Sequence, residues 1–145
     1  MTPYHKFTED LARAVAEAKK FPLGGLKPAP RPALAADAPR VLIFSPHPDD
    51  ECIIGALPLR LRRQAGWNIV NVAVTQGSNV ARQDERWQEL QKACEYIGFN
   101  VIQTAPRGLE KVNPKTRSAE PARWQPMVSV IAEILRREAP KAIFF

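Results

Sequence analysis

The sequence predicts an α/β fold in which a mostly parallel sheet carries helices on both faces. From Arg40 onward, apolar runs alternate with segments of helical periodicity. The runs VLIFS (41–45) and NIVNVAVT (68–75) are almost continuously apolar, which is typical of strands covered on both sides. Strands that alternate with helices at this spacing require right-handed crossovers, which favours a single parallel sheet.

The composition indicates one globular domain. The 145 residues are 45% hydrophobic and 25% charged, which excludes collagen-like, coiled-coil and wholly disordered chains. The net charge is +6, but the basic residues are scattered without interleaved aromatics, so no nucleic-acid partner is expected. No apolar run is long enough to span a membrane, and acids occupy the N-terminus where a signal peptide would be apolar. A cytoplasmic protein is expected.

The first 39 residues form an arm before the domain, which we place at residues 40–145. Residues 8–20 predict a short helix with Thr8 as N-cap and two lysines in its last turn. Residues 22–39 hold five prolines and favour an extended linker. Such an arm packs on its own domain or on a second subunit, so a homo-oligomer is compatible with the sequence.

Two helices are expected between the first three strands. The first spans 51–65, where Pro58 should kink or shorten it before Gly66 ends it. The second spans 83–97 and is closed by Gly98. Its apolar face at helical spacing belongs to the core and consists of Trp87, Leu90, Cys94 and Ile97. Cys52 and Cys94 form no CxxC motif, so both are expected to be reduced core residues.

The remaining elements complete a Rossmann-like pattern that is incomplete at the C-terminus. A short strand is expected at 100–104, followed by a long loop over 105–120. Pro121 opens the last helix, which Pro140 ends, and residues 141–145 begin another buried strand. Ligands of such sheets bind at the carboxyl ends of the strands.

The segment PHPDDE (46–51) stands at the carboxyl end of the first strand and points to a metal site. His47 can supply an imidazole nitrogen and Asp50 a carboxylate oxygen, a donor set that suits zinc better than calcium or magnesium. Asp49 and Asp50 are adjacent in a non-helical turn, so their carboxylates should diverge. One can then bind metal while the other takes a proton from the water that the metal activates. Alternatively, Asp49 or Asp50 caps the following helix and His47 is a satisfied polar neighbour.

PHPDDE after a buried strand resembles the signature of the zinc-dependent LmbE-like (PIG-L) de-N-acetylase family. The resemblance extends through three further segments in the expected order, from about Arg40 to Phe145: Arg86-x-x-Glu89-x-x-x-Ala93 with Ile97-Gly98, Pro106 to Leu109, and Pro140 to Phe145. It implies a Rossmann-like fold and leaves the arm unexplained.

The resemblance also implies roles for particular residues. His47 and Asp50 would bind one Zn²⁺, Asp49 would be the general base, and Arg86 would help to hold substrate. Arg107 is a weaker candidate, since it is equally well a solvated loop charge.

The family supplies a third zinc ligand, a histidine in an HxDH-like segment after the strand that KAIFF begins. The sequence stops before that segment, so we expect it to be the N-terminal portion of a longer protein, with weak metal binding and poor catalysis by itself. His5 lies before the linker and is not expected to complete the site.

The predicted function is removal of an acetyl group from an N-acetylated amino sugar or its conjugate, such as an N-acetylglucosamine conjugate, by a zinc-dependent hydrolase. Two alternatives remain open. The chain could be a truncated paralogue that acts as a binding module without turnover, or a metal-dependent phosphohydrolase that uses the same His and Asp residues.

Overall fold

The fold is built on a four-stranded sheet in which every strand is parallel, as the sequence predicts. The computed structural model describes residues 2–22 and 24–145. The strands are β1 (Arg40–Ser45), β2 (Asn68–Ala73), β3 (Asn100–Gln103) and β4 (Ala142–Phe144), in the spatial order β3-β2-β1-β4. The two central strands are therefore β1 and β2, the two that the sequence marks as the most continuously apolar.

Alternate residues of the central strands supply two separate cores, one on each face of the sheet. Val41 and Ile43 of β1 belong to one buried cluster together with Leu90 and Cys94 of α4 (Gln83–Ile97). Leu42 belongs to a second cluster that also contains Val70, Val72 and Ile134. This division follows from the two-residue repeat of a strand and explains why the central strands are apolar on both sides.

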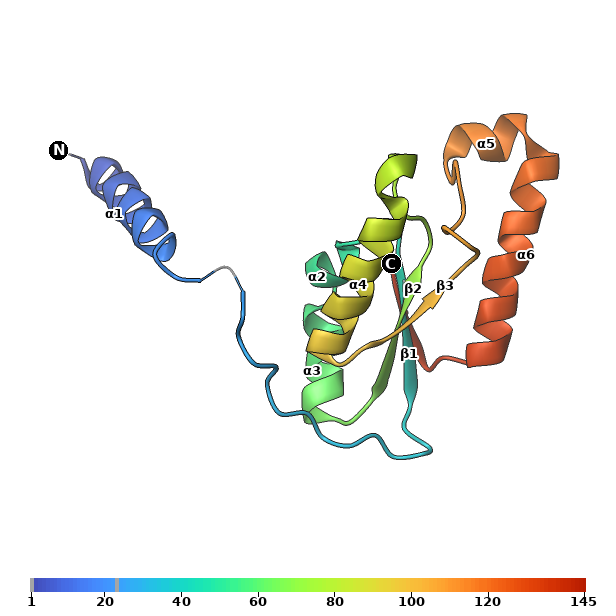
Figure 1. Cartoon of the computed structure of the whole chain (residues 1–145), viewed down its shortest axis with the longest axis horizontal. Coiled ribbons are helices and arrows are strands. Elements are labelled where there is room, and N and C mark those ends of the chain that lie inside the picture. The colour runs from blue at the N-terminus through green and yellow to red at the C-terminus, as the bar shows by residue number, and fades with distance from the viewer. Residues whose placement is uncertain (1, 23) are drawn as a thin grey trace.

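Helices cover both faces (Figure 1). α3 (Ala56–Gln64) and α4 lie against the first cluster, and α6 (Pro121–Glu138) lies against the second. α4 has the predicted bounds, with Leu90 and Cys94 fully buried and Trp87 and Ile97 packed against the same cluster. Gly98 ends α4 in the left-handed conformation at φ 84°, which glycine adopts without steric cost.

The helix predicted over 51–65 is wrong as a single element. The chain forms α2 (Asp50–Ile53) and then α3, with Gly55 at the break. A Cβ at Gly55 would overlap the carbonyl oxygen of Glu51, so the backbone approaches itself too closely there for any larger residue. Pro58 falls in the first turn of α3, where its missing N–H is not needed.

The long loop predicted over 105–120 contains a short helix, α5 (Pro114–Ala119). Asn113 caps it, because its side-chain oxygen accepts a hydrogen bond of 2.9 Å from the Thr116 backbone N–H. Proline follows the cap as the first helical residue. An Asn-Pro pair of this kind is a recognisable start signal for a helix. A 3-10 turn, η1 (Val80–Arg82), precedes α4.

The N-terminal helix α1 (Pro3–Ala18) starts five residues earlier than predicted. Thr2 is the N-cap, and its hydroxyl and the His5 side chain form a reciprocal capping box. Thr8 instead lies inside the helix, where its hydroxyl donates to the His5 carbonyl at 2.8 Å. α1 buries none of its residues and stands apart from the domain at the end of an extended segment (Figure 1).

The two cysteines differ in environment. Cys94 is buried in the first core cluster, as predicted, but Cys52, which lies within α2, is exposed and is not the core residue that the sequence predicts. Among residues 2–22 and 24–145, no helix has the length and apolar character needed to cross a bilayer.

Candidate active site

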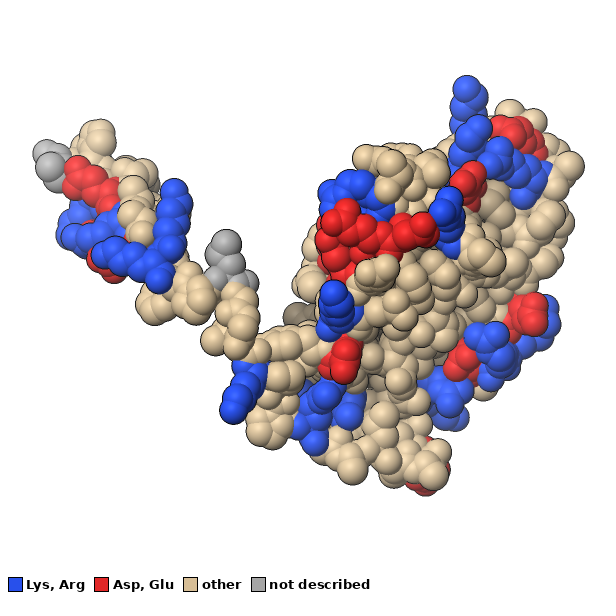
Figure 2. Space-filling model, in the orientation of Figure 1, with Lys and Arg blue, Asp and Glu red and all other residues tan. Residues whose placement is uncertain are grey.

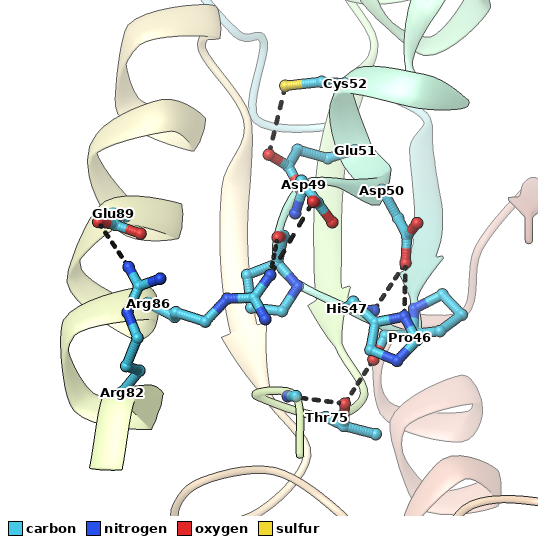
Figure 3. Close-up of polar contacts among 12 residues, drawn as sticks. Pro46, His47, Asp49, Asp50, Glu51, Cys52, Thr75, Arg82, Arg86 and Glu89 are labelled. Carbon is cyan, nitrogen blue, oxygen red and sulfur yellow. Dashed lines mark hydrogen bonds and ion pairs between the residues drawn. The ribbon is translucent and has the colours of Figure 1, made fainter. Parts of the chain in front are cut away.

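The segment Pro46 to Glu51 consists of a loop at the carboxyl end of β1, where parallel sheets bind their ligands, and the first two residues of α2. Asp50 therefore lies in a helix and not in the non-helical turn that the sequence predicts. A neighbouring loop holds this segment in place. The Thr75 hydroxyl donates to the Pro46 carbonyl at 2.6 Å and accepts from the Gly77 N–H at 3.1 Å. The loops that follow β1 and β2 are thus joined directly at the edge of the sheet (Figure 3).

His47 and Asp50 form a pair at the start of α2. Oδ2 of Asp50 accepts a hydrogen bond of 2.6 Å from the His47 backbone N–H and lies 3.7 Å from the imidazole Nδ1. The His47 side chain is mostly exposed, so its ring is accessible to a ligand. An imidazole nitrogen and a carboxylate oxygen are donor types that zinc accepts in proteins.

Asp49 turns its carboxylate away from this pair (Figure 3). Its φ of 132° is unusual for a residue other than glycine, and the conformation carries Oδ2 to 3.9 Å from the Arg86 guanidinium. Asp49 precedes α2 as its N-cap residue but makes no side-chain capping bond, and Asp50 bonds backwards to His47. Neither carboxylate therefore makes the helix-capping bond that the alternative interpretation expects.

Glu51 is a buried acid whose role the sequence analysis did not identify. Its side chain accepts a hydrogen bond of 3.1 Å from the Asp49 N–H and another from the Cys52 thiol. A buried carboxylate needs such donors, because burying it without them would cost several kcal/mol. Glu51 therefore holds the backbone of Asp49 in its strained conformation. The sequence signal that could have pointed to Glu51 is its position directly after two other acidic residues, Asp49 and Asp50.

Partial burial of the sulfur raises the pKa of the Cys52 thiol to about 11, and the negative charge of Glu51 adds to this effect. Cys52 is consequently a neutral thiol near pH 7. This environment does not activate it as a nucleophile.

Arg86 reaches the loop from α4. Its Nη2 donates to the Pro48 carbonyl at 2.9 Å, and its guanidinium lies so close to Gly77 that a Cβ there would come within 2.6 Å of Nη1. Arg86 thus joins α4 to both loops of the site. Glu89, one turn further along, lies near Arg82 at 3.8 Å.

A hollow of about 470 Å³ opens beside His47. Its walls come from the loop after β2 and from the segment after β3: His47, Thr75, Gly77, Ser78, Val80, Gln83, and Leu109 through Asn113. The second wall is attached to the first, because Thr75 and Gly108 form an isolated antiparallel bridge and the Leu109 N–H donates to the Val74 carbonyl at 2.7 Å. The walls carry hydroxyl, amide and charged groups, as a site for a polar ligand requires.

Two other candidates from the sequence lie outside this site. Arg107 forms an exposed ion pair with Asp84, at 2.8 Å, and does not line the hollow. His5 is part of the capping box of α1, with its Nδ1 2.8 Å from the Thr2 hydroxyl. Within the described residues, no group of three or more His, Cys, Asp or Glu side chains is gathered for a metal ion. His47 and Asp50 place two potential metal-ligating groups side by side.

Comparison with known proteins identifies the family of this chain. No curated protein matches the chain. The family model described as PIG-L, GlcNAc-PI de-N-acetylase, matches residues 42–145, which begin in β1 and include the loop, the hollow and β4. This range covers most of the sequence and leaves out only α1, the linker and the first residues of the domain. The chain belongs to the PIG-L family of de-N-acetylase-type hydrolases.

Proposed function

We propose that this chain forms the site of a zinc-dependent hydrolase that removes an acetyl group from an N-acetylated amino sugar or its conjugate. The observation that carries the proposal is that two neighbouring carboxylates point to different partners. Asp50 pairs with His47, whereas Asp49, its sequence neighbour, points to Arg86. Membership of the PIG-L family supports the reaction class, and the hydroxyl and amide groups that line part of the hollow suit a hydroxylated substrate.

His47 and Asp50 are the residues that would hold the zinc ion. When bound, zinc lowers the pKa of a water molecule from about 15.7 towards 7 and polarises a carbonyl group. The His47 backbone N–H bonds to Oδ2 of Asp50 and so limits the rotation of that carboxylate before any metal arrives. The remaining ligands would come from groups other than the described side chains of this loop.

Asp49 is the proposed general base. It accepts one proton of the attacking water while the water oxygen bonds to the amide carbon. The C–N bond then breaks as this proton passes from Asp49 to the amide nitrogen, which gives acetate and the free amine. Three contacts keep its position. Glu51 holds its N–H, Arg86 holds the Pro48 carbonyl before it, and the Arg86 guanidinium lies beside its carboxylate. Together they fix the direction in which the carboxylate points.

The sugar would occupy the hollow beside His47, with its hydroxyls facing Thr75, Ser78 and Gln83. Arg86 is the proposed substrate-binding residue. Arg86 and Asp49 are not among the residues that line the hollow, but Arg86 lies against Gly77, which is, so Arg86 would act at the Gly77 end of the hollow. The absence of a side chain at Gly77 leaves room for its guanidinium.

The direct test is Asp49→Asn in the chain at saturating zinc, with release of acetate from N-acetylglucosamine conjugates as the readout. Loss of a general base lowers the rate by about 10²–10⁴-fold. Asp37→Asn is the matched control, because Asp37 lies exposed in the linker and makes the same change of charge. An unchanged rate in Asp49→Asn with zinc still bound would place the base elsewhere.

Zinc binding is measured separately, by competition with a chromogenic chelator. About one equivalent per chain is expected, with loss of affinity in His47→Ala and Asp50→Asn and none in Asp37→Asn. No binding at saturating zinc would favour a binding module without turnover. Release of phosphate from a phosphoester, with none of acetate from the sugar, would favour a phosphohydrolase.

A further inference from the structure

The backbone on either side of His47 is held by two side chains from other parts of the chain (Figure 3). Pro46 and Pro48 flank His47, and proline has no backbone N–H, so each can be held only through its carbonyl group. The Pro46 carbonyl accepts from the Thr75 hydroxyl at 2.6 Å. The Pro48 carbonyl accepts from the Arg86 guanidinium at 2.9 Å. The direction in which the chain presents His47 therefore depends on these two donors.

The Thr75 hydroxyl is oriented by a second hydrogen bond, within its own loop. It accepts from the Gly77 N–H at 3.1 Å while it donates to the Pro46 carbonyl. Gly77 has a φ of 81°, and the Arg86 guanidinium packs against it. A shift of Gly77 would move the N–H that orients the hydroxyl, and the Pro46 carbonyl would then lose a fixed donor.

Gln83, the first residue of α4, is buried where its neighbours in the sequence face the solvent. Arg82, Asp84 and Glu85 are exposed and take part in ion pairs. Figure 2 shows acidic and basic side chains next to each other over α4. Only 3% of the surface of Gln83 is exposed, and its Nε2 donates to the Gly77 carbonyl at 2.9 Å. Gln83 thus holds Gly77 from the start of α4.

The contact with Gly77 fixes the orientation of the Gln83 side-chain amide. A carbonyl oxygen can only accept hydrogen bonds, so the nitrogen and not the oxygen of the amide faces Gly77. The amide oxygen, Oε1, is buried and has no hydrogen-bond partner among residues 2–22 and 24–145. A buried acceptor without a partner lowers the stability of a fold.

The unpaired Oε1 indicates that the amide of Gln83 does not serve stability. Methionine has nearly the same shape as glutamine and lacks the unpaired acceptor. Gly77 is half-buried, so water can replace the lost donor at its carbonyl. Gln83→Met should therefore leave the fold equally stable or more stable. Side chains that act against stability in this way are expected at functional sites.

We infer that Gln83 is a positioning residue for His47. Its hydrogen bond fixes Gly77, which orients the Thr75 hydroxyl. That hydroxyl in turn fixes the Pro46 carbonyl, directly before His47. When the first of these bonds is lost, the separation between the imidazole and its carboxylate partner varies more, and metal binding weakens. The inference rests on the proposed zinc site, to which it adds a residue that is not a metal ligand.

The first experiment measures backbone hydrogen exchange by NMR in the metal-free chain with Gln83→Met. The N–H groups of Gly77 and His47 should exchange at least about fivefold faster than in the unaltered chain, as expected when one hydrogen bond is lost. The N–H groups of the central strands should exchange at an unchanged rate. Gln91→Met is the matched control, because Gln91 lies exposed on the same helix, and it should change neither loop.

The second experiment measures zinc affinity by competition with a chromogenic chelator. Gln83→Met should lower the affinity by about tenfold, the lower end of the loss for groups that support metal ligands, whereas Gln91→Met should not change it. Thr75→Val breaks the next hydrogen bond and should lower the affinity as well. The double variant Gln83→Met with Thr75→Val should bind zinc no more weakly than Thr75→Val alone, because both residues act through one series of bonds.

Urea unfolding separates positioning from a general structural role, since the midpoint of Gln83→Met should equal or exceed that of the unaltered chain. Three results would overturn the inference. They are unchanged exchange at Gly77 and His47, additive losses of zinc affinity in the double variant, and a lower midpoint with faster exchange throughout the sheet. If the unaltered chain binds no zinc, the proposed function fails, and the exchange measurement still decides whether Gln83 positions His47.

Discussion

Gly108→Ala tests the position of the wall that closes the hollow beside His47. Gly108 has φ 77° and lies in the bridge to Thr75. A Cβ at this position would come within 2.8 Å of the Thr75 Cα and 3.0 Å of the Val74 carbonyl oxygen. Both are backbone atoms, so the contact cannot be relieved by rotation of a side chain. Either the backbone at Gly108 or the backbone at Val74 and Thr75 must therefore move.

The matched control is Gly66→Ala. Gly66 has φ 68°, but a Cβ there meets nothing within 4 Å. Both variants force alanine into the left-handed region, at a cost of about 1–2 kcal/mol each. Only Gly108→Ala adds the steric clash, which should cost about 1–3 kcal/mol more by the measure of overpacked sites. The difference between the two variants isolates the clash.

The assay is urea unfolding followed by tryptophan fluorescence, since three tryptophans are present. With an m-value of about 2 kcal/mol/M, an additional loss of about 2 kcal/mol lowers the unfolding midpoint of Gly108→Ala by about 1 M relative to Gly66→Ala. Equal midpoints, or a lower one for Gly66→Ala, would refute the close approach of the wall to Thr75.

Four further predictions concern the burial of side chains. Arg62→Met should lower the free energy of unfolding by about 1.5–3 kcal/mol, because Arg62 donates hydrogen bonds to the carbonyls of Pro32 and Gly98. Arg63→Met, at the exposed neighbouring position, should have little effect in the same urea assay. Ser45→Ala should lower the free energy of unfolding by about 1–3 kcal/mol, because it leaves the buried side-chain oxygen of Asn71 without its 2.7 Å hydrogen bond. Ser129→Ala, on the surface, should leave the free energy of unfolding unchanged. A thiol reagent should modify one cysteine, Cys52, in the folded chain and both after unfolding; two reactive thiols in the folded state would contradict the burial of Cys94. Burial raises the pKa of Cys94 to about 12, above its ordinary value of 9.0, so its contribution to stability is complete below pH 9 and should fall as the pH rises towards 12.

The helices show where sequence patterns suffice and where they fail. The bounds of α4 follow from its apolar spacing and from Gly98, since both signals act within a few residues. The break between α2 and α3 follows instead from Gly55, where the backbone approaches the Glu51 carbonyl. From the sequence, Pro58 is the more obvious place for the helix to break. A proline in the first turn of a helix, however, removes no helical hydrogen bond.

The candidate site divides in the same way. The motif PHPDDE at the end of a buried strand predicts the position of the candidate site and its residues His47, Asp49 and Asp50. The prediction is possible because His and Asp side chains can each take part in only a few kinds of chemistry. The part played by Glu51 depends on its burial, and the contact of Arg86 with Pro48 joins residues 38 positions apart. No local pattern reports either one.

The sequence by itself determined the order of the elements, the parallel sheet and the place of the site. These features depend on hydrophobic burial and on turn residues, and both can be recognised from residues that are close together in the sequence. Only the tertiary structure decided the burial of Glu51 beneath Asp49, how the segment after β3 closes the hollow, and which surface the linker occupies. Those outcomes depend on contacts between distant segments, whose geometry exists only once the sheet has brought them together.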